Sequence, residues 1–394
     1  MLFHVPVEGA PTTESEVETE SINASAEHGP ASRRGGARLT VDLGAIRDNY
    51  LYLRTRLGSA ACGAVVKADG YGLGATKIAP VLERAGCRSF FVAHLDEAIA
   101  LRASLAASSV IHILNGVPPG AEPDCVAAEA IPVLNSLEQL TAWRRTAAIL
   151  GRRLPATIQV DSGMARLGLS VSEVEQITDD ARAFEGLDLQ LIMSHLACAD
   201  EPDHPANEAQ RKTFEAMRAR LPAAPASFAN SAGIFLGSAY HFDLARPGAA
   251  LYGINPTLGR SNPMRAVLQL SAKVIQVREL AAGAAVGYGY SFRATSAVRI
   301  ATISLGYADG WHRNAGISAA AFFQGVRLPF AGRVSMDSIT LDVSALPATL
   351  TAGSFVDLIG DRQTVADVAR LADTIDYEIL TGLGRRFERR YVGT

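Results

Sequence analysis

The feature that most constrains the fold is a regular alternation of short apolar runs with longer amphipathic stretches. Short apolar runs are typical of strands buried on both faces, and the stretches between them have helical spacing. This alternation predicts parallel strands joined by crossover helices. The eight predicted strands span residues 62–66, 89–93, 110–114, 131–134, 156–160, 190–194, 226–229 and 243–245.

Eight such units in about 200 residues are typical of a TIM (β/α)8 barrel. At 394 residues the chain is also longer than one hydrophobic core usually supports, and beyond about residue 265 it becomes β-rich, with Gly, Pro and Asp turns. We therefore predict an α/β fold with an N-terminal barrel over residues 38–264 and a C-terminal mostly-β domain over residues 265–394. The strand-like segment 38–43 precedes the barrel, and we expect it to pair with the second domain.

Composition narrows the class of partner. Residues 1–37 are rich in Glu, Ser and Thr and poor in apolar side chains, which predicts a disordered acidic tail. A formal net charge of −3 provides no basic surface for nucleic acid, and no run of about 20 apolar residues predicts a membrane span. The N-terminus lacks a secretory pattern, so we expect a cytoplasmic protein with a small-molecule substrate.

The cysteines and histidines do not predict a metal site. Cys62, Cys87, Cys125 and Cys198 are widely spaced, without a C-x-x-C pair or a nearby histidine at ligand spacing. The eight histidines are scattered and include no H-E-x-x-H helix. We expect buried free thiols and no metal.

Polar residues at the ends of the predicted strands are the first candidates for chemistry, because active sites of TIM barrels form at the carboxyl ends of the strands. A lysine is costly there unless its amine is solvated, paired or used, for example in a Schiff base. The structural alternative is a lysine that extends to the solvated rim. The candidates are Lys67, Arg166, His195, Asn230, Ser231 and Arg246.

Two glycine-rich loops at the carboxyl ends of the predicted barrel strands indicate a phosphate-bearing ligand. Gly70, Gly72 and Gly74 follow the first strand, and Gly248 with Ala249 follows the eighth, where barrels often bind phosphate. Ordinary turn glycines are the alternative. The first loop also fits a loose G-x-G-x-x-A dinucleotide pattern, but His94 stands about where that motif requires an acidic residue.

The ordered motifs of residues 38–394 resemble the alanine racemase family. In the first domain the matching segments are VVKADGYGLG, DSGMARLG, SHLACAD and ARPGAALYG. In the second they are AVGYGYSF, ISLGYADGW, AGRVSMDSITLDVS and DYEILTGLGRR. The resemblance implies a two-base racemisation of alanine on a pyridoxal 5'-phosphate aldimine, which interconverts L-alanine and D-alanine. It also implies an isomerase that serves D-alanine biosynthesis as a peptidoglycan precursor.

By this resemblance, Lys67 holds the cofactor and acts as one catalytic base, and Tyr288 acts as the other. Arg246 faces the pyridine nitrogen, and His195 links that arginine to Tyr288. Arg166 contacts the cofactor's phenolic oxygen and, with Met336, the substrate carboxylate. The positions that match phosphate contacts are Tyr71, Ser231, Gly248, Ala249 and Tyr377.

The resemblance further implies a homodimer with shared active sites, because Tyr288, Tyr307, Met336 and Asp337 reach the site from the partner subunit in the family.

The chemistry of racemisation agrees with the roles of the two bases. Racemisation removes a proton from one face of Cα and returns it to the other, so it needs two bases. Lysine and tyrosine both have high ordinary pKa values, which nearby positive charge or burial must lower. An arginine at the pyridine nitrogen weakens the electron sink and favours racemisation over decarboxylation.

Two positions depart from the family pattern. Gln159 stands where many members have a carbamylated lysine that orients the arginine matched by Arg166. A glutamine cannot carry a carbamate, although its amide oxygen could accept a hydrogen bond from Arg166. Ser335 replaces a cysteine of some members, and we expect little effect.

Three alternatives stay open at this point. The first is a racemase of the same fold for larger amino acids such as lysine, serine or arginine, and pocket size near Tyr377 and Tyr307 should decide it. The second is a basic-amino-acid decarboxylase, against which Arg246 argues. The third is a non-enzymatic cofactor-binding barrel, against which the β-rich second domain argues.

Overall fold

The structure is a computed structural model that describes residues 34–180, 182–346 and 349–393. Most of the predicted acidic tail, residues 1–33, lies outside this range. No helix within the described ranges is long and apolar enough to cross a bilayer. The same ranges contain no group of three or more His, Cys, Asp or Glu side chains that could hold a metal ion.

The first half of the chain forms the predicted barrel. Seven parallel strands, β3 to β9, pair in chain order, and β10 pairs in parallel with β2. The N–H groups of Asp243 and Arg246 donate to the carbonyls of Ala226 and Ala229 at 3.0 and 2.8 Å, which joins β9 to β10 and closes the ladder. The strands are β2 (Ala61–Cys62), β3 (Ala64–Val65), β4 (Ser89–Val92), β5 (Val110–Ile113), β6 (Ile131–Leu134), β7 (Leu154–Gln159), β8 (Leu187–Met193), β9 (Ala226–Ser227) and β10 (Leu244–Ala245).

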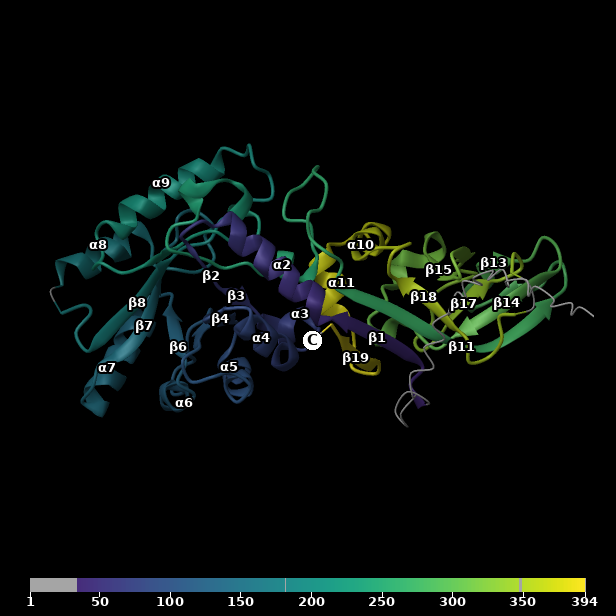
Figure 1. The fold of residues 1–394 in the computed structure, drawn as a ribbon, viewed down its shortest axis with the longest axis horizontal. Coiled ribbons are helices and arrows are strands. Elements are labelled where there is room, and N and C mark those ends of the chain that lie inside the picture. Colours follow the sequence, from purple (N-terminus) through teal and green to yellow (C-terminus); the bar gives the residue numbers. More distant parts are fainter. Residues whose placement is uncertain (1–33, 181, 347–348, 394) are drawn as a thin grey trace, which may run out of the picture. The chain divides into compact units, whose positions relative to one another are not determined.

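Helices surround these strands on the outside (Figure 1). Local capping sets where several of them begin: Ser136 accepts from the N–H of Gln139, and Ser170 forms a capping box with Glu173. The helices are α2 (Leu43–Arg56), α3 (Lys67–Tyr71), α4 (Ala75–Arg84), α5 (Leu95–Arg102), α6 (Glu122–Ala127), α7 (Leu137–Leu150), α8 (Val171–Asp179) and α9 (Ala206–Arg218), with 3-10 turns η1 (Gly233–Phe235), η2 (Ser238–Tyr240) and η3 (Ala249–Tyr252).

The strands of the barrel carry a buried apolar core. Ile111, Ile113, Val133, Ile158 and Ile192 lie on neighbouring strands and are fully buried. Each contributes on the order of 1.5–3 kcal/mol relative to an exposed side chain. This core provides the rigid strand ends that carry the candidate site.

The second half is a mainly antiparallel sheet ordered β16-β15-β18-β11-β1-β19, in which β14 also pairs with β11 and β17 pairs with β14. The long strand β11 runs along β1, β14 and β18 (Figure 1). Its strands are β11 (Leu268–Leu280), β14 (Val298–Ile303), β15 (Ala320–Phe323), β16 (Val326–Pro329), β17 (Ile339–Asp342), β18 (Phe355–Ile359) and β19 (Glu388–Val392), with the separate pair β12 (Ala285–Val286) and β13 (Phe292–Arg293). The helical segments are η4 (Tyr288–Tyr290), η5 (Tyr307–Asp309), η6 (Arg313–Ser318), α10 (Val365–Ala372) and α11 (Asp376–Gly382).

Strand β1 (Ala37–Asp42) belongs to this second sheet. It pairs antiparallel with β11 and parallel with β19. The expected pairing of segment 38–43 with the second domain is therefore confirmed. The division at residues 264 and 265 stays a prediction.

Candidate active site

Lys67 lies two residues beyond the carboxyl end of β3, at the start of α3. Burial and, second, the positive charge of Arg166 lower the pKa of its amine, while the carboxylate of Glu97 opposes them. A lowered pKa leaves more of the amine neutral at pH 7, and the neutral amine is the nucleophile and the base. The predicted strand-end lysine is thus partly buried and tuned for covalent or proton-transfer chemistry.

The glycine-rich loop after Lys67 packs against the C-terminal segment of the chain. Gly72 has φ 81°, and a Cβ there would lie 2.5 Å from the carbonyl oxygen of Leu380. Gly74 has φ 101°, and a Cβ there would lie 2.3 Å from the hydroxyl of Tyr391. The Arg389 guanidinium donates to the Gly72 carbonyl at 2.6 Å. These glycines therefore allow close approach of two backbone segments.

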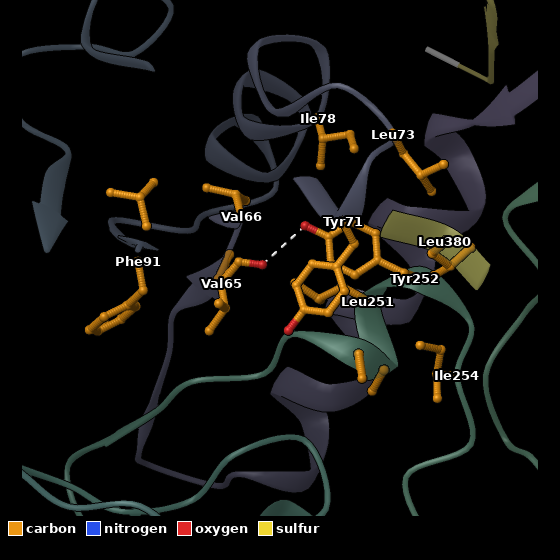
Figure 2. Close-up of a cluster of buried hydrophobic side chains, with 14 of the residues drawn as sticks. Val65, Val66, Tyr71, Leu73, Ile78, Phe91, Leu251, Tyr252, Ile254 and Leu380 are labelled. Carbon is orange, nitrogen blue, oxygen red and sulfur yellow. Dashed lines mark hydrogen bonds between the residues drawn. The ribbon is translucent and has the colours of Figure 1, made fainter. Parts of the chain in front are cut away.

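Three tyrosines gather beside this loop. Tyr71 stacks on Tyr252 with ring centroids 4.4 Å apart, and Tyr377 lies 6.2 Å from Tyr71. Figure 2 shows Tyr252 bonded through its hydroxyl to the carbonyl of Val65, at 3.0 Å. Burial raises the pKa of both Tyr71 and Tyr252, so both phenols stay protonated and can donate hydrogen bonds.

A small cradle lies where the loop after β10 meets the end of β3. The Ser231 hydroxyl accepts from the N–H groups of Gly248 and Ala250, at 2.9 and 3.1 Å. A Cβ on Gly248 would lie 2.3 Å from the Tyr71 hydroxyl. The predicted phosphate residues Tyr71, Ser231, Gly248 and Ala249 therefore come together, with two hydroxyl donors around backbone that only glycine permits.

Arg246 is a buried cation with neutral partners. It is 3% exposed, and its guanidinium donates to the Ser227 hydroxyl at 2.5 Å and the Ser194 carbonyl at 2.6 Å. No ion pair of the described residues includes it. Burial lowers its pKa to about 9, so the guanidinium remains charged at neutral pH. An unpaired buried charge of this kind is a frequent feature of ligand sites.

His195 lies against this guanidinium, with Nδ1 3.4 Å from an Arg246 nitrogen. Burial, and then the charge of Arg246, lower the pKa of His195 to about 3. The imidazole is therefore neutral at pH 7. Because Nδ1 faces a donor, the tautomer consistent with this contact carries its proton on Nε2.

Sequence reasoning missed a second histidine. His112 lies inside strand β5, is 3% exposed and stacks on Phe91 with ring centroids 4.6 Å apart. Its Nδ1 lies 3.0 Å from the Thr157 hydroxyl, and burial followed by the charge of Arg246 lowers its pKa to about 3. The available signal was a single polar residue in the apolar run VIHIL.

Arg166 is exposed and lies on a loop whose backbone N–H groups donate to one carboxylate. Asp161 Oδ1 accepts from the N–H groups of Gly163, Met164 and Ala165. Gln159 touches this loop through the backbone: its amide nitrogen donates to the Leu167 carbonyl at 3.1 Å. Among the hydrogen bonds of the described residues, none joins Gln159 to the Arg166 guanidinium. The expected Gln159 contact is therefore replaced by one that holds the loop itself.

The site residues of the second domain are exposed. Tyr288 is 70% and Met336 53% exposed, and Tyr307 and Tyr377 are exposed too. In the described part of the chain, no hydrogen bond, ion pair or ring contact joins Tyr288 or Met336 to Lys67. A single chain therefore does not bring the two predicted bases into contact.

One arginine in the GLGRR motif ties the exposed loops together. Arg386 donates to Asp309 and to Asp337, each at 2.7 Å. Backbone bonds from Tyr307 to Ser335 and from Ala308 to Met336 join the same two segments. The exposed Tyr307 and Met336 therefore lie on two loops that these bonds hold together.

Comparison with known proteins identifies relatives over nearly the whole chain. Residues 41–256 match the family model described as alanine racemase, N-terminal domain, and residues 267–391 match the one described as alanine racemase, C-terminal domain. A protein of Mesorhizobium japonicum named "Alanine racemase, catabolic" is 60% identical over 359 residues, which are 91% of this chain and 94% of that one. A protein of Brucella ovis named "Alanine racemase" is 50% identical over 371 residues, again 91% of this chain and 94% of that one.

A solved structure agrees with these matches. The crystal structure of alanine racemase from Bartonella henselae with covalently bound pyridoxal phosphate has a TM-score of 0.87 and 43% sequence identity. The match covers 91% of this chain and 99% of that chain. The similarity therefore extends to both halves of the fold.

Proposed function

The chain belongs to the alanine racemase family, and from this premise we propose how its own residues carry out the reaction. The protein is an isomerase that interconverts L-alanine and D-alanine, with pyridoxal phosphate as its cofactor. The Mesorhizobium and Brucella relatives are both named for alanine, and no observation favours a larger amino acid.

The residues at the barrel mouth fit this cofactor. Lys67 presents a partly buried amine, and the Ser231 and Tyr71 hydroxyls surround a backbone turn at Gly248 that a Cβ would fill. When bound, pyridoxal phosphate supplies an aldehyde for a lysine amine and an electron sink that acidifies the Cα–H of an amino acid. Lys67 would hold it, and Ser231, Tyr71, Gly248, Ala249 and Tyr377 would bind its phosphate.

The observation that carries the proposal is the closeness of Lys67 to this cradle. The N–H of Val65, two residues before Lys67, donates to the carbonyl of Pro247, the residue before Gly248, at 2.8 Å. An amine and a phosphate cradle thus lie at neighbouring strand ends. Burial and Arg166 lower the pKa of that amine, which suits both attachment of the cofactor and proton transfer.

Arg246 would face the pyridine nitrogen. Its three hydrogen bonds to described residues, which are Ser227, Ser194 and His195, leave two of the five guanidinium N–H donors for a ligand. With a pKa of about 9, Arg246 keeps its proton at neutral pH and donates a hydrogen bond only. This environment favours rapid return of the proton to Cα over decarboxylation.

The two bases would be Lys67 and Tyr288, one on each face of Cα. Tyr288 is 70% exposed, which suits a side chain that enters the site of a second copy. A two-fold homodimer with shared active sites follows, in which Met336 and Arg166 receive the substrate carboxylate. The N–H on Nε2 of a neutral His195 would then be free to donate to the Tyr288 oxygen, linking that base to Arg246.

We also infer a cytoplasmic enzyme. Cys62, Cys87 and Cys125 are free, buried thiols, which suits a reducing compartment. Because racemisation runs in both directions, the enzyme could supply D-alanine for peptidoglycan or remove it. The Mesorhizobium relative is named for the catabolic direction.

The direct test is chiral analysis of alanine after incubation of the purified protein with L-alanine and pyridoxal phosphate. We expect equal amounts of both enantiomers at equilibrium, and none of this activity from Lys67→Ala. Borohydride should fix the cofactor on the peptide that contains Lys67. Fixation on another lysine, or activity on lysine, serine or arginine but not on alanine, would overturn the proposal.

A further inference from the structure

The backbone immediately after Lys67 is wound in the left-handed sense. Ala68, Asp69 and Tyr71 have φ of 53°, 53° and 54°, and Gly70 between them has φ of 63°. For residues with a Cβ, this conformation costs free energy at each position. Four such residues in a row persist only where surrounding contacts over-determine them.

Some of those contacts lie within the turn. The N–H groups of Gly70 and Gly72 donate to the carbonyls of Val66 and Ala68, and Asp69 accepts from the N–H of Ala75 at 2.9 Å. These bonds stabilise the turn and hold it to Val66, directly after its own strand β3, but they do not anchor it to a neighbouring strand. The anchor comes from another element.

That anchor is Glu97, in the first turn of α5. One carboxylate oxygen accepts from the N–H of Ala68 at 2.5 Å. The other accepts from the N–H groups of Ala93 and His94, at 2.7 and 3.1 Å, where the chain leaves β4. A single carboxylate therefore joins the residue after Lys67 to the neighbouring strand end. Bonds to a charged acceptor are stronger than bonds between neutral groups.

We propose that Glu97 is a positioning residue for Lys67: it clamps the left-handed turn at Ala68, which aims the lysine, and it holds one negative charge near the amine. The inference rests on the role proposed above for Lys67. None of the motifs that carried the family resemblance contains Glu97, so the role could not be read from them.

The charges around the amine support a second effect. Arg166, from the loop after β7, lowers the pKa of Lys67, and Glu97, from α5, raises it. His195, beyond β8, is neutral at pH 7 because its own pKa is about 3. Glu97 is thus the anionic group acting on Lys67 among the described residues, and its removal should lower the pKa of the amine.

The test compares Glu97→Gln with Asp96→Asn in the full chain. Both variants remove one unit charge from neighbouring residues of α5, but Asp96 is exposed and makes none of the three bonds. Glutamine is also accepted at this capping position of a helix, so helix α5 should survive. The measurement is the pH dependence of acetylation of Lys67 by acetic anhydride, followed by mass spectrometry, without cofactor.

We expect the labelling midpoint to fall by about one pH unit in Glu97→Gln and to stay in place in Asp96→Asn. Glu97→Asp keeps the charge but shortens the reach to Ala68, so its midpoint should stay near that of the wild type while it binds pyridoxal phosphate about tenfold more weakly. An unchanged midpoint in Glu97→Gln, or equal shifts in Glu97→Gln and Asp96→Asn, would overturn the inference.

Failure of the proposed function would give a different result. If borohydride fixed the cofactor on another lysine, Lys67 would lose its assigned role whatever the acetylation midpoints were. If the cofactor were fixed on Lys67 and the Glu97→Gln midpoint did not move, only the role of Glu97 would be wrong.

Discussion

The Arg246 guanidinium lies 3.4 Å from Nδ1 of His195, and neither side chain has a carboxylate partner among the described residues. The pair consists of a buried cation and a neutral imidazole whose pKa is about 3. Its charge is balanced only by neutral hydrogen-bond acceptors. The floor of the site is therefore electropositive, which suits an anionic cofactor and a substrate carboxylate.

The buried His112 should make stability depend on pH. Its pKa falls from 6.5 to about 3 on folding, so the unfolded chain binds a proton between these pH values and the folded chain does not. The contribution of His112 to the free energy of unfolding is constant above pH 6.5 and decreases as pH falls from 6.5 to about 3, by about 1.4 kcal/mol per pH unit, and His195 contributes in the same direction. His112→Gln should lower the number of protons taken up on unfolding in this pH range by up to one.

Urea denaturation between pH 7 and pH 5 measures the slope. His94→Gln, at an exposed histidine, serves as the matched control and should keep the wild-type slope. Equal slopes for His112→Gln and wild type would mean that His112 is not held neutral.

Gly248→Ala should damage the phosphate cradle. The added Cβ would lie 2.3 Å from the Tyr71 hydroxyl and 3.2 Å from Val65, so Tyr71 must move. We expect a loss of about 1–3 kcal/mol in stability and weaker cofactor binding. Adding Tyr71→Phe should restore part of the stability but not the affinity, because the clashing oxygen is also the proposed donor to the phosphate. Gly360→Ala, where the nearest atom would be 3.7 Å away, is the control.

Shared active sites predict complementation between two inactive variants. A mixture of Lys67→Ala and Tyr288→Phe should form heterodimers in which one of two sites has both bases. After random exchange of equal amounts, about a quarter of the wild-type activity should return. Mass spectrometry of differently tagged chains verifies the exchange. Absence of activity in verified heterodimers would show that both bases come from one chain.

Gln159→Glu should cost stability and weaken substrate binding. The substitution replaces the donor to the Leu167 carbonyl with a buried carboxylate oxygen, which costs about 1–3 kcal/mol. It also places negative charge near the loop of Arg166, so the KM for alanine should rise. Gln159→Met removes the hydrogen bond without adding charge, and should lower the melting temperature with little change in KM.

The activity should not depend on dissolved carbon dioxide, because Gln159 cannot form a carbamate. Steady-state rates of the wild type should be equal with and without added bicarbonate. Activation by bicarbonate would contradict the role given to Gln159.

Much of the barrel could be predicted from the sequence, because buried parallel strands and amphipathic helices have different periods. The eight predicted apolar runs all correspond to observed strands, although the first is divided at Gly63 into β2 and β3. That division arises because Gly63 lies close to both neighbouring strands, β10 and β4. Its N–H donates to the carbonyl of Ala245 in β10 at 2.9 Å, and a Cβ there would lie 3.0 Å from the ring of Phe91 in β4.

Residues recognised by motif were predicted more easily than residues that support them. Lys67 and Arg246 stand at strand ends inside recognisable segments. Glu97, His112 and Arg386 act through contacts with elements distant in the chain: Arg386 bonds to Asp309 across 77 positions. Local patterns contain no record of such distances, so these residues became visible only in the folded chain.

The sequence by itself determined the order of strands and helices, the family and the chemical type of each site residue, because these depend on local periodicity and on motifs. Only the tertiary structure decided that β1 joins β19, that Arg246 is buried without a carboxylate, and that four left-handed residues follow Lys67. The strand pairing and the left-handed turn depend on which distant groups accept hydrogen bonds from the backbone N–H groups. The burial of Arg246 depends on which distant groups exclude water from its charge. Such competition is settled by packing in three dimensions, which no local pattern of residues encodes.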